Sequence, residues 1–230
     1  MTSKQTKDYV ELIYGTENAR TAKTDYPTKL ISYLFDKYQF KKDEKILDLG
    51  CGRGEFLNAF CSKGLIGYGI DASNLAIKEC PTAKINVCDL ETEQLPYPDN
   101  YFDIIFSKSV FEHFHRPEKL MKEVYRISKR GAKVINLVPS WEYCSDIYYE
   151  DYTHRTPYML SAFRDLHILA GFKNVETSFF KQLPVLWHDK IGLFKILSYF
   201  TRVLTPSSLR YKFKWIKFSK EVMIIAYARK

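Results

Sequence analysis

The segment KILDLGCGRGEF, at positions 45–56, constrains the fold of this chain more than any other part of the sequence. Its first half is an apolar run of strand length, and the residues after the last glycine begin a helical pattern. Gly50, Gly52 and Gly54 stand at alternate positions, where they let the backbone turn tightly and approach a ligand without a Cβ in the way. The segment therefore predicts a strand, a tight turn and a helix whose N-terminus faces a ligand.

The rest of the chain repeats this alternation of strand-like and helix-like runs. We expect strands at residues 45–50, 65–71, 84–89, 101–107, 132–139, 174–182 and 221–230, and helices at 28–40, 54–64, 73–80, 117–128 and 156–172. Strands that alternate with helices are typical of an α/β fold with a mostly parallel sheet and right-handed crossovers.

Two stretches interrupt the alternation and divide the chain. We expect an N-terminal helical lid at 1–43, a core at 44–182 with an acceptor-side insertion at 140–155, a basic aromatic insertion at 183–219, and the last strand at 220–230. A length of 230 residues with 46% hydrophobic and 27% charged residues is ordinary for one packed domain and disfavours disorder. Insertions on such a scaffold are where specificity usually lies, although surface decoration is the alternative.

Membrane spans and disulfides are not expected. No apolar run reaches the roughly 18 residues that a membrane helix needs, and the first residues lack an apolar signal core. The five cysteines form no CxxC pair, so neither a disulfide framework nor a zinc ribbon is indicated. We therefore expect a cytoplasmic protein.

The net charge of +8 comes from one late segment. Residues 181–220 contain nine lysines and arginines but a single acid, Asp189, so the rest of the chain is neutral overall. Such a segment can face an anionic membrane, a nucleic acid or an anionic substrate; the alternative is a solvated helical face. A membrane contact would place the protein at the periphery of the inner membrane face.

The acids around the glycine turn indicate which ligand it binds. Glu55 stands where a dinucleotide fingerprint, GxGxxG, has its third glycine, and it would repel a pyrophosphate, as would Asp48. A positively charged group, such as an amine or a sulfonium, is expected instead. Asp71 ends the second strand, where an acid accepts hydrogen bonds from ribose hydroxyls. Asp89 ends the third strand, where an acid can meet the exocyclic amine of an adenine while the backbone of Leu90 binds the ring.

A ribose, an adenine and a cationic amino-acid part together describe S-adenosylmethionine (SAM). Over residues 44–138 the sequence resembles the class I SAM-dependent methyltransferases, most closely their type-11, small-molecule branch. The resemblance rests on ILDLGCGRGEF, the acid in GIDAS, CDLE followed by LPYPDNYFDIIFS, and the EHF after it; AFRDLHILAGFKNVE resembles the late helix-to-strand step. It implies a Rossmann-like sheet of seven strands in the order 3-2-1-4-5-7-6, with the last strand antiparallel and helices on both faces. The product would be S-adenosylhomocysteine (SAH).

The resemblance also assigns residues to the cofactor. Asp48, Gly50 and Gly52 would shape the methionine end of the pocket, Ser107 would lie beside the sulfonium, and Arg20 would pair with the cofactor carboxylate. The full set of expected cofactor-binding residues is Asp48, Gly50, Cys51, Gly52, Asp71, Ala72, Asp89, Leu90, Ser107 and Arg20.

Two histidines are candidates for the base that a hydroxyl acceptor would need. His113 follows the fourth strand, at the carboxyl edge of the sheet; packing is its alternative role. His154 follows Glu150 and Asp151, which could orient its ring and raise its basicity; its alternative role is a helix cap. His113 and His115 are two residues apart and would point in opposite directions on a helix, so no metal site is expected.

The run Asp151-x-x-His154-Arg155 resembles methyltransferases that act on sugars of bacterial surface glycans. We therefore expect O-methylation of a sugar or sugar-phosphate in a cell-surface polysaccharide pathway, with Trp141, Tyr148, Tyr149 and Tyr152 able to stack on sugar faces. The alternatives are another small metabolite of quinone or polyketide type, an RNA, which no motif supports, and cofactor binding without catalysis. Nucleic acid is not an expected partner, and the oligomeric state is left open.

Overall fold

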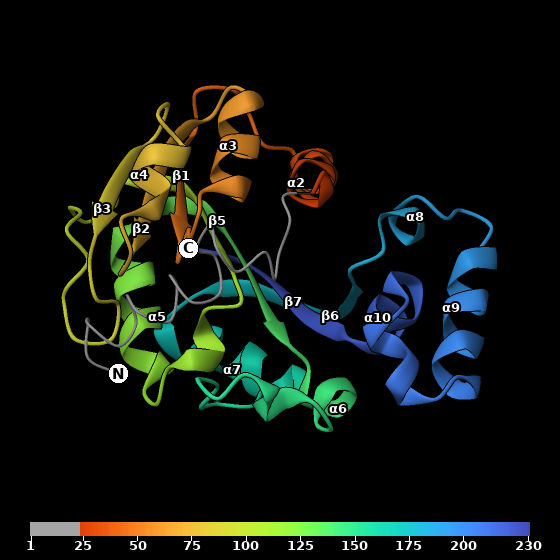
Figure 1. Cartoon of the computed structure of the whole chain (residues 1–230). Helices are drawn as coiled ribbons and strands as arrows, with labels where there is room; N and C mark the ends of the chain where they lie inside the picture. The colour runs from red at the N-terminus through yellow and green to blue at the C-terminus, as the bar shows by residue number, and fades with distance from the viewer. Residues whose placement is uncertain (1–23) are drawn as a thin grey trace.

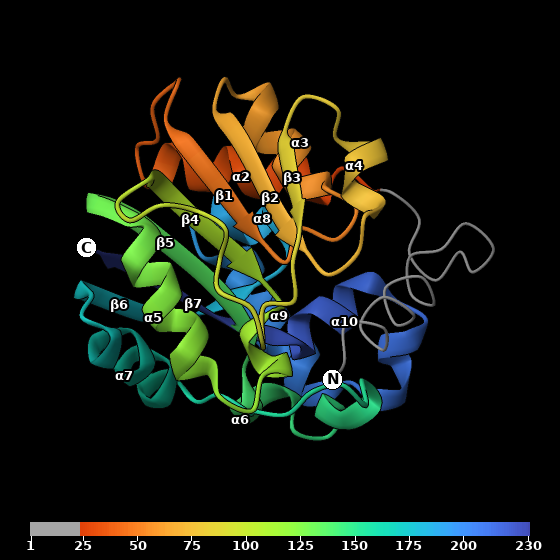
Figure 2. The same ribbon diagram turned by 90° about the vertical axis from the view of Figure 1, so that its left-hand side faces the viewer.

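A seven-stranded sheet organises residues 24–230, the part of the chain that the computed structural model describes, apart from the side chains of residues 75 and 76. The strands are β1 (Lys45–Leu49), β2 (Ile66–Asp71), β3 (Lys84–Val87), β4 (Phe102–Lys108), β5 (Ser128–Pro139), β6 (Lys173–Lys181) and β7 (Val222–Arg229). They lie in the order β3-β2-β1-β4-β5-β7-β6 (Figures 1 and 2). Strands β1 to β5 pair in parallel, whereas β7 runs antiparallel to β5 and β6. The predicted fold class and strand order are confirmed.

Helices cover both faces of this sheet. The helices are α2 (Tyr26–Lys37), α3 (Glu55–Ser62), α4 (Leu75–Glu79), α5 (Pro117–Ile127), α6 (Trp141–Cys144), α7 (Leu160–Ala170), α8 (Pro184–Trp187), α9 (Leu193–Leu204) and α10 (Lys214–Lys220). Figure 1 shows α2 and α3 on one side of the sheet and α5 and α7 on the other. Because successive strand residues point to opposite faces, Ile46 packs in the cluster beneath α2 and α3, while Leu47 and Leu49 pack in the cluster beneath α5 and α7.

Helix α2 belongs to the core, which corrects part of the expected lid. Leu30, Ile31 and Leu34 lie on its inner face and are fully buried in the cluster beneath α2 and α3. Pro27 lies in its first turn, where a backbone N–H would have no acceptor within the helix, so the lack of an N–H in proline costs no hydrogen bond. The described part of the predicted lid is therefore a sheet-covering helix, and residues 1–23, with Arg20, lie outside the described residues.

The two predicted insertions form helical segments around the carboxyl edge of the sheet. Residues 140–155 form α6 and the 3-10 turn Tyr148–Glu150, and residues 183–219 form α8, α9, α10 and the 3-10 turn Ser207–Tyr211. The second set makes a lobe beside β6 and β7, coloured blue in Figure 1. Within residues 24–230 no helix is both long enough and apolar enough to cross a lipid bilayer.

Replacing Phe60 by alanine tests the packing of the cluster beneath α2 and α3. Phe60 is fully buried on α3, and its ring centroid lies 5.3 Å from that of Phe106 on β4. The cavity left by Phe60→Ala should lower the free energy of unfolding by about 3–5 kcal/mol, measured by urea denaturation. Leu169→Ala is the control: Leu169 is 81% exposed, so the change should stay within about 0.5 kcal/mol. Equal effects would contradict the packing described.

Candidate functional site

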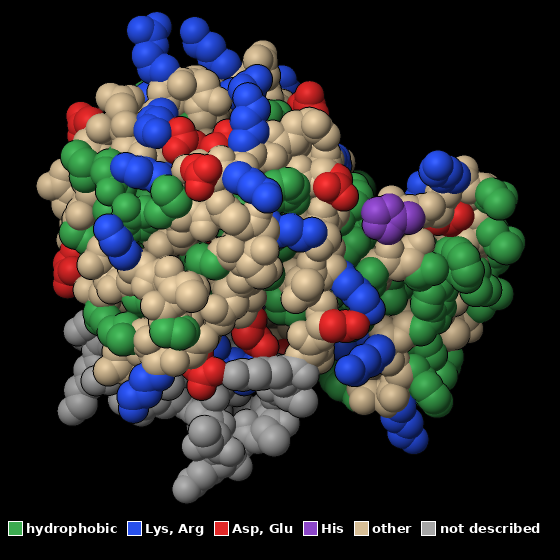
Figure 3. All heavy atoms as spheres, turned by 90° about the horizontal axis from the view of Figure 1, so that it is seen from above, with side chains coloured by type: hydrophobic (Ala, Val, Ile, Leu, Met, Phe, Trp, Pro, Cys, Tyr) green, Lys and Arg blue, Asp and Glu red, His purple; other side chains and the backbone are tan. Residues whose placement is uncertain are grey.

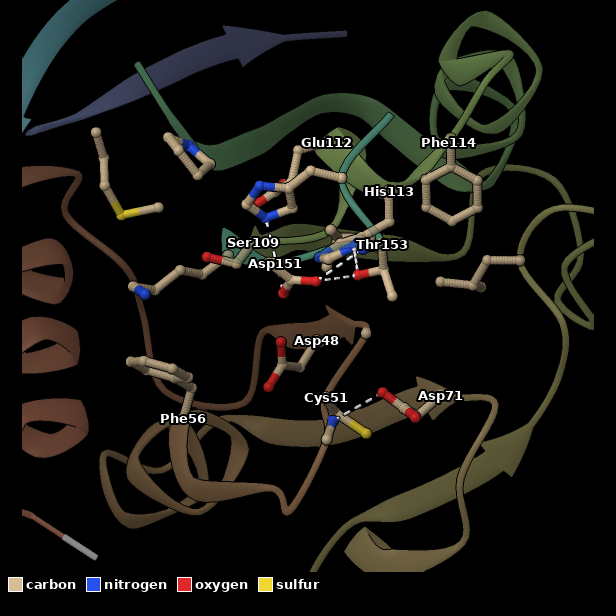
Figure 4. A pocket seen from close by; sticks show the side chains of 18 of the residues that line it. Asp48, Cys51, Phe56, Asp71, Ser109, Glu112, His113, Phe114, Asp151 and Thr153 are labelled. Carbon is tan, nitrogen blue, oxygen red and sulfur yellow. Dashed lines mark hydrogen bonds and ion pairs between the residues drawn. The ribbon is translucent and has the colours of Figure 1, made fainter. Parts of the chain in front are cut away.

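A cavity of about 540 Å³ opens at the carboxyl edge of β1, β2 and β4. One wall is the glycine turn between β1 and α3 together with the ends of β2 and β3. The opposite wall is the segment after β4 and the insertion at 140–155. Figure 4 shows Asp48, Cys51 and Asp71 on the first wall and Glu112, His113 and Thr153 on the second. The strand order brings these segments together because β1 lies between β2 and β4.

The glycine turn has a backbone that other residues would strain. Gly50 and Gly52 have φ angles of +72° and +53°, in the left-handed region. A Cβ on Gly50 would lie 2.5 Å from Cγ2 of Val110, so a side chain is excluded there by space as well. A Cβ on Gly52 would meet nothing within 4 Å, so the open side of this glycine leaves room for a ligand to approach the backbone.

Asp48 is the buried carboxylate at the end of β1. Its side chain lines the cavity, the residue is 2% exposed, and Oδ2 has no hydrogen-bond partner among the described residues. Burial, and then the negative charge of Asp71, raise the pKa of Asp48 well above its usual range. A positively charged group in the cavity would satisfy Oδ2 and stabilise the ionised form.

Asp71 links the end of β2 to the glycine turn. Its Oδ2 accepts a hydrogen bond from the backbone N–H of Gly52 at 2.9 Å, and its Oδ1 accepts one from Ser73 at 2.9 Å. Burial raises the pKa of Asp71, and the backbone donors oppose that rise. Each carboxylate oxygen has a second lone pair, so both can also accept hydrogen bonds from a diol in the cavity.

The remaining predicted residues of this wall also line the cavity. Cys51, Ala72, Asp89 and Leu90 all face it, and Asp89 Oδ1 accepts the backbone N–H of Glu91 at 3.0 Å. Ser107 does not contribute to the wall. It is fully buried inside β4 and donates a hydrogen bond to Oδ1 of Asn136 on β5 at 2.8 Å, so the prediction that it lies beside the sulfonium is wrong. Lys108 and Ser109 line the cavity instead.

The opposite wall brings His113 and His154 together, with ring centroids 5.0 Å apart. His113 ends the 3-10 turn Phe111–His113, whereas His154 comes from the insertion at 140–155. Backbone hydrogen bonds join the two segments: the N–H groups of Arg155 and Thr156 both donate to the carbonyl oxygen of Glu112, at 2.7 and 3.1 Å. Both histidines line the cavity, as do Asp151 and Thr153.

The hydrogen bonds of the two imidazoles define their tautomers. Nδ1 of His154 lies 2.6 Å from the carbonyl oxygen of Tyr148, which only accepts, so Nδ1 carries the proton. Nδ1 of His113 lies 2.8 Å from Oγ1 of Thr153, whose hydroxyl donates to Oδ1 of Asp151 at 2.5 Å. The threonine oxygen therefore accepts from His113, and Nε2 is the lone-pair nitrogen of both rings when they are neutral.

Burial keeps both rings neutral near pH 7. Burial first, and then the charge of His154, lower the pKa of His113 to about 4. Burial also lowers the pKa of His154, and Asp151, with its Oδ2 at 3.9 Å from Nε2, offsets only part of that effect. Asp151 therefore raises the pKa of His154 as the sequence suggested, but burial outweighs this effect and the net shift is downward.

Glu112 is a functional candidate to which the sequence reasoning gave no role. Its side chain is fully buried and lines the cavity, and within residues 24–230 no hydrogen bond of good geometry satisfies either carboxylate oxygen, although Ser109 lies near enough to lower the pKa of the carboxyl. Burial raises the pKa of Glu112 to about 8 and lowers the pKa of Lys108, also in the cavity wall, to about 8. A carboxylate directly before His113 was visible in the sequence, but its burial depends on the tertiary fold.

Comparison with known proteins identifies the family. Residues 47–136 match the type-11 family model described as Methyltransferase domain. Residues 47–136 therefore carry a SAM-dependent methyltransferase domain of the type-11 family. A SAM-dependent methyltransferase from Archaeoglobus fulgidus has a similar solved structure, with a TM-score of 0.64 and 22% identity over 88% of this chain and 94% of that one. At that identity the likeness shows the fold.

Two curated relatives cover different shares of this methyltransferase. An uncharacterized protein from Methanocaldococcus jannaschii is 29% identical over 154 residues, which are 63% of this chain and 72% of that protein. Phosphoethanolamine N-methyltransferase 2 from Caenorhabditis elegans is 27% identical over 184 residues, which are 74% of this chain but 41% of that protein. The chain thus spans less than half of the second relative's length.

The first wall fits the cofactor of this family, SAM. The buried Oδ2 of Asp48 without a partner suits an ammonium group, and the open face of Gly52 leaves room for close approach to the backbone. The remaining acceptor capacity of Asp71 suits a ribose diol. When bound, SAM supplies a methyl group on a positively charged sulfur, which is the electrophile of the family's reaction.

The raised pKa of Asp48 predicts that this methyltransferase binds SAH more weakly as the pH falls. The carboxyl takes up a proton at a higher pH than usual in the empty protein, and only its ionised form attracts the SAH ammonium. Asp48→Asn should lower the SAH affinity at pH 8 by roughly tenfold or more and should flatten the pH profile, as measured by calorimetry. Asp165→Asn, an exposed change on α7, is the control. A steep profile in Asp48→Asn would contradict the assignment.

Proposed function

We propose that this methyltransferase transfers the methyl group to a hydroxyl oxygen of a sugar or sugar-phosphate in a cell-surface polysaccharide pathway. The observation that carries the proposal is the pair of neutral imidazoles, His113 and His154, on the wall opposite the glycine turn. With Asp151 and Thr153 they make the acceptor side of the cavity rich in hydrogen-bonding groups. Such a wall suits a hydroxylated acceptor better than an apolar quinone or polyketide.

The cofactor is held by the wall that carries the glycine turn. Asp48 binds its ammonium group, Asp71 its ribose hydroxyls, and Asp89 the amine of its adenine, while Leu90 packs beside the ring. All four residues line one continuous cavity, and the two acids nearest the turn have the burial and acceptor capacity that these roles require. Proximity and orientation then supply most of the rate enhancement.

His113 and His154 act on the acceptor proton. A sugar hydroxyl keeps its proton at neutral pH, so the proton has to leave as the new O–C bond forms. Because the hydroxyl becomes strongly acidic as the methyl group arrives, even an imidazole with a low pKa can accept its proton late in the step. The low pKa values of both histidines ensure that an unprotonated nitrogen is available near pH 7.

Removing either imidazole should slow turnover while the cofactor still binds. A positioned base typically raises the rate roughly 10²–10⁴-fold. Of the two variants His154→Ala and His113→Ala, the one that lacks the base should therefore produce SAH at least tenfold more slowly, while its affinity for SAH stays unchanged. His115→Ala, two residues from His113 and exposed, should behave as wild type. Full activity in both cavity variants would contradict a role for the imidazoles.

The acceptor class is tested by a panel assayed for SAH release and for a methylated product by mass spectrometry. The panel holds nucleotide-linked sugars, quinols, polyketide phenols, phosphoethanolamine and RNA. Methylation of a sugar hydroxyl supports the proposal, and methylation of any other class alone replaces it. Tight SAH binding without methylation of any panel member would favour a cofactor-binding protein without catalysis.

We also propose that the lobe formed by α8, α9 and α10 rests on an anionic membrane surface. Helix α9 has the reverse of the usual burial pattern: its buried residue is Ser198, and most of its apolar side chains are exposed. Those more than 40% exposed are Leu193, Phe194, Ile196, Leu197, Tyr199, Phe200, Val203 and Leu204. Figure 3 shows them as part of the green surface at the outer edge of the lobe. A continuous apolar surface of this kind is typical of an interaction site.

The charge of the lobe favours lipid over a second protein chain. Lys190, Lys195, Lys212, Lys214 and Lys217 are exposed. Other cations of this segment contact the insertion at 140–155: Arg210 pairs with Asp146, and Arg202 stacks on Tyr143. Lys217 lies 3.8 Å from Glu221. Exposed apolar side chains and exposed lysines in one lobe match the acyl boundary and the anionic headgroups of a membrane surface.

Vesicle cosedimentation tests this contact. Wild type should sediment with vesicles that contain phosphatidylglycerol and much less with phosphatidylcholine alone, and added salt should weaken the binding. Ile196→Glu with Phe200→Glu should reduce the bound fraction roughly tenfold, as should Lys212, Lys214 and Lys217 all changed to Glu. Leu169→Glu, an exposed change on α7, is the control. A wild-type dimer that the α9 variant converts to monomer, without vesicle binding, would assign this face to a second copy instead.

A further inference from the structure

Three potential metal ligands meet on the acceptor side of the cavity. Glu112, His113 and His154 each offer one ligand atom, and these atoms all lie within 4.8 Å of one another. The expectation of no metal site considered only His113 and His115, whose spacing is unsuitable on a helix. The fold instead pairs His113 with His154, 41 positions later in the chain.

The carboxylate of Glu112 gives a second and independent reason to expect a cation. Glu112 is fully buried and lines the cavity, and among the described residues neither of its oxygens makes a hydrogen bond of good geometry; Ser109 is the nearby donor that lowers its pKa. Burying a carboxylate without a partner is costly unless a cation or a proton compensates it. Asp151 adds a second negative charge near Glu112, while Lys108 is the positive charge that opposes cation binding.

The hydrogen bonds around the histidines have the pattern that metal ligands usually show. A ligating imidazole commonly donates its second N–H to a carbonyl or to a carboxylate, which fixes its tautomer and its orientation. His154 donates Nδ1–H to the carbonyl oxygen of Tyr148. His113 donates Nδ1–H to Thr153, whose hydroxyl donates to Asp151. In both rings Nε2 keeps the lone pair that a metal requires.

We propose that Glu112, His113 and His154 bind one divalent transition-metal ion, with Zn²⁺ as the best match, on the acceptor side of the cavity. Two imidazoles and one carboxylate are a ligand set that zinc accepts in catalytic sites with a position left open, and Mg²⁺ prefers oxygen ligands. The open position would take the acceptor hydroxyl. This inference rests on the proposed function for the identity of the acceptor and replaces the direct proton transfer to His113 or His154 with an action through the metal.

The ion would change how the acceptor proton leaves. Coordination lowers the pKa of a bound hydroxyl, as it does for zinc-bound water, so the proton passes to solvent and a metal-bound oxygen anion is left. A lone pair of that oxygen forms the new O–C bond. The C–S bond of the sulfonium breaks, and its electrons stay on sulfur as the neutral thioether of SAH. His113 and His154 then act on the hydroxyl through the metal rather than by taking the proton themselves.

Metal binding is measured on full-length protein without a histidine tag, stripped with a chelator and kept reduced. Zn²⁺ alone is titrated by calorimetry, and bound zinc is counted by elemental analysis. We expect one ion per chain for wild type and for His115→Ala. Glu112→Gln and His154→Ala should each weaken binding at least tenfold, and Thr153→Val, which removes the hydrogen bond to His113, by roughly tenfold or more.

The outcomes separate this proposal from the proposed function. Circular dichroism and SAH binding are measured on every variant, so that a loss of fold is not read as a loss of a ligand; His154→Ala stands in if Glu112→Gln does not fold. Cys61→Ser checks that a half-buried thiol is not the zinc ligand. Stoichiometric zinc that survives in both Glu112→Gln and His154→Ala, or no zinc in wild type, overturns the metal site but leaves SAH binding and methyl transfer intact. Absence of SAH binding overturns the proposed function whatever the zinc result.

Discussion

The attachment of the glycine turn to the end of β2 is the constraint on which the rest of the site depends. The N–H groups of Gly50 and Cys51 both donate to the carbonyl oxygen of Ile70, at 2.8 and 3.1 Å, and Gly52 donates to the side chain of Asp71. These bonds hold a left-handed backbone segment against a neighbouring parallel strand. They place two buried acids, one from each strand, on a single wall of the cavity. The wall that carries His113 and His154 can act on a ligand only because these hydrogen bonds fix the position of the opposite wall.

The sequence predicted which residues share the wall formed by the glycine turn and the ends of β2 and β3 because its information is local. A strand, the glycine turn and a helix follow one another within residues 45–62, Asp71 is the last residue of β2, and Asp89 lies two residues beyond β3. Parallel strands bring their carboxyl ends to one edge, so residues at those ends meet whatever the details of packing. Once the strand order was inferred from the family resemblance, most of this wall followed from residue positions alone.

Residues whose roles depend on the partner across a strand or a loop were harder to predict. Ser107 and Lys108 are neighbours, but side chains alternate between faces of the sheet, so one meets Asn136 inside the fold and the other meets the cavity. The pairing of His113 with His154 depends on how the insertion at 140–155 folds back onto Glu112. Likewise, the outward apolar face of α9 reads in sequence like a buried helix, because periodicity does not say which side is covered.

The antiparallel direction of β7 has a consequence for how this enzyme can diversify. Lys181, the last residue of β6, pairs directly with Val222, the first residue of β7. The lobe is therefore the connection between two strands that pair antiparallel with each other, and it occupies the position of a long loop in a β-hairpin. A loop in that position can lengthen, shorten or be exchanged while the register of the sheet is kept. Its neighbours Gln182 and Glu221 line the cavity, so new loops would be presented beside the cavity without changing the glycine turn on its other wall.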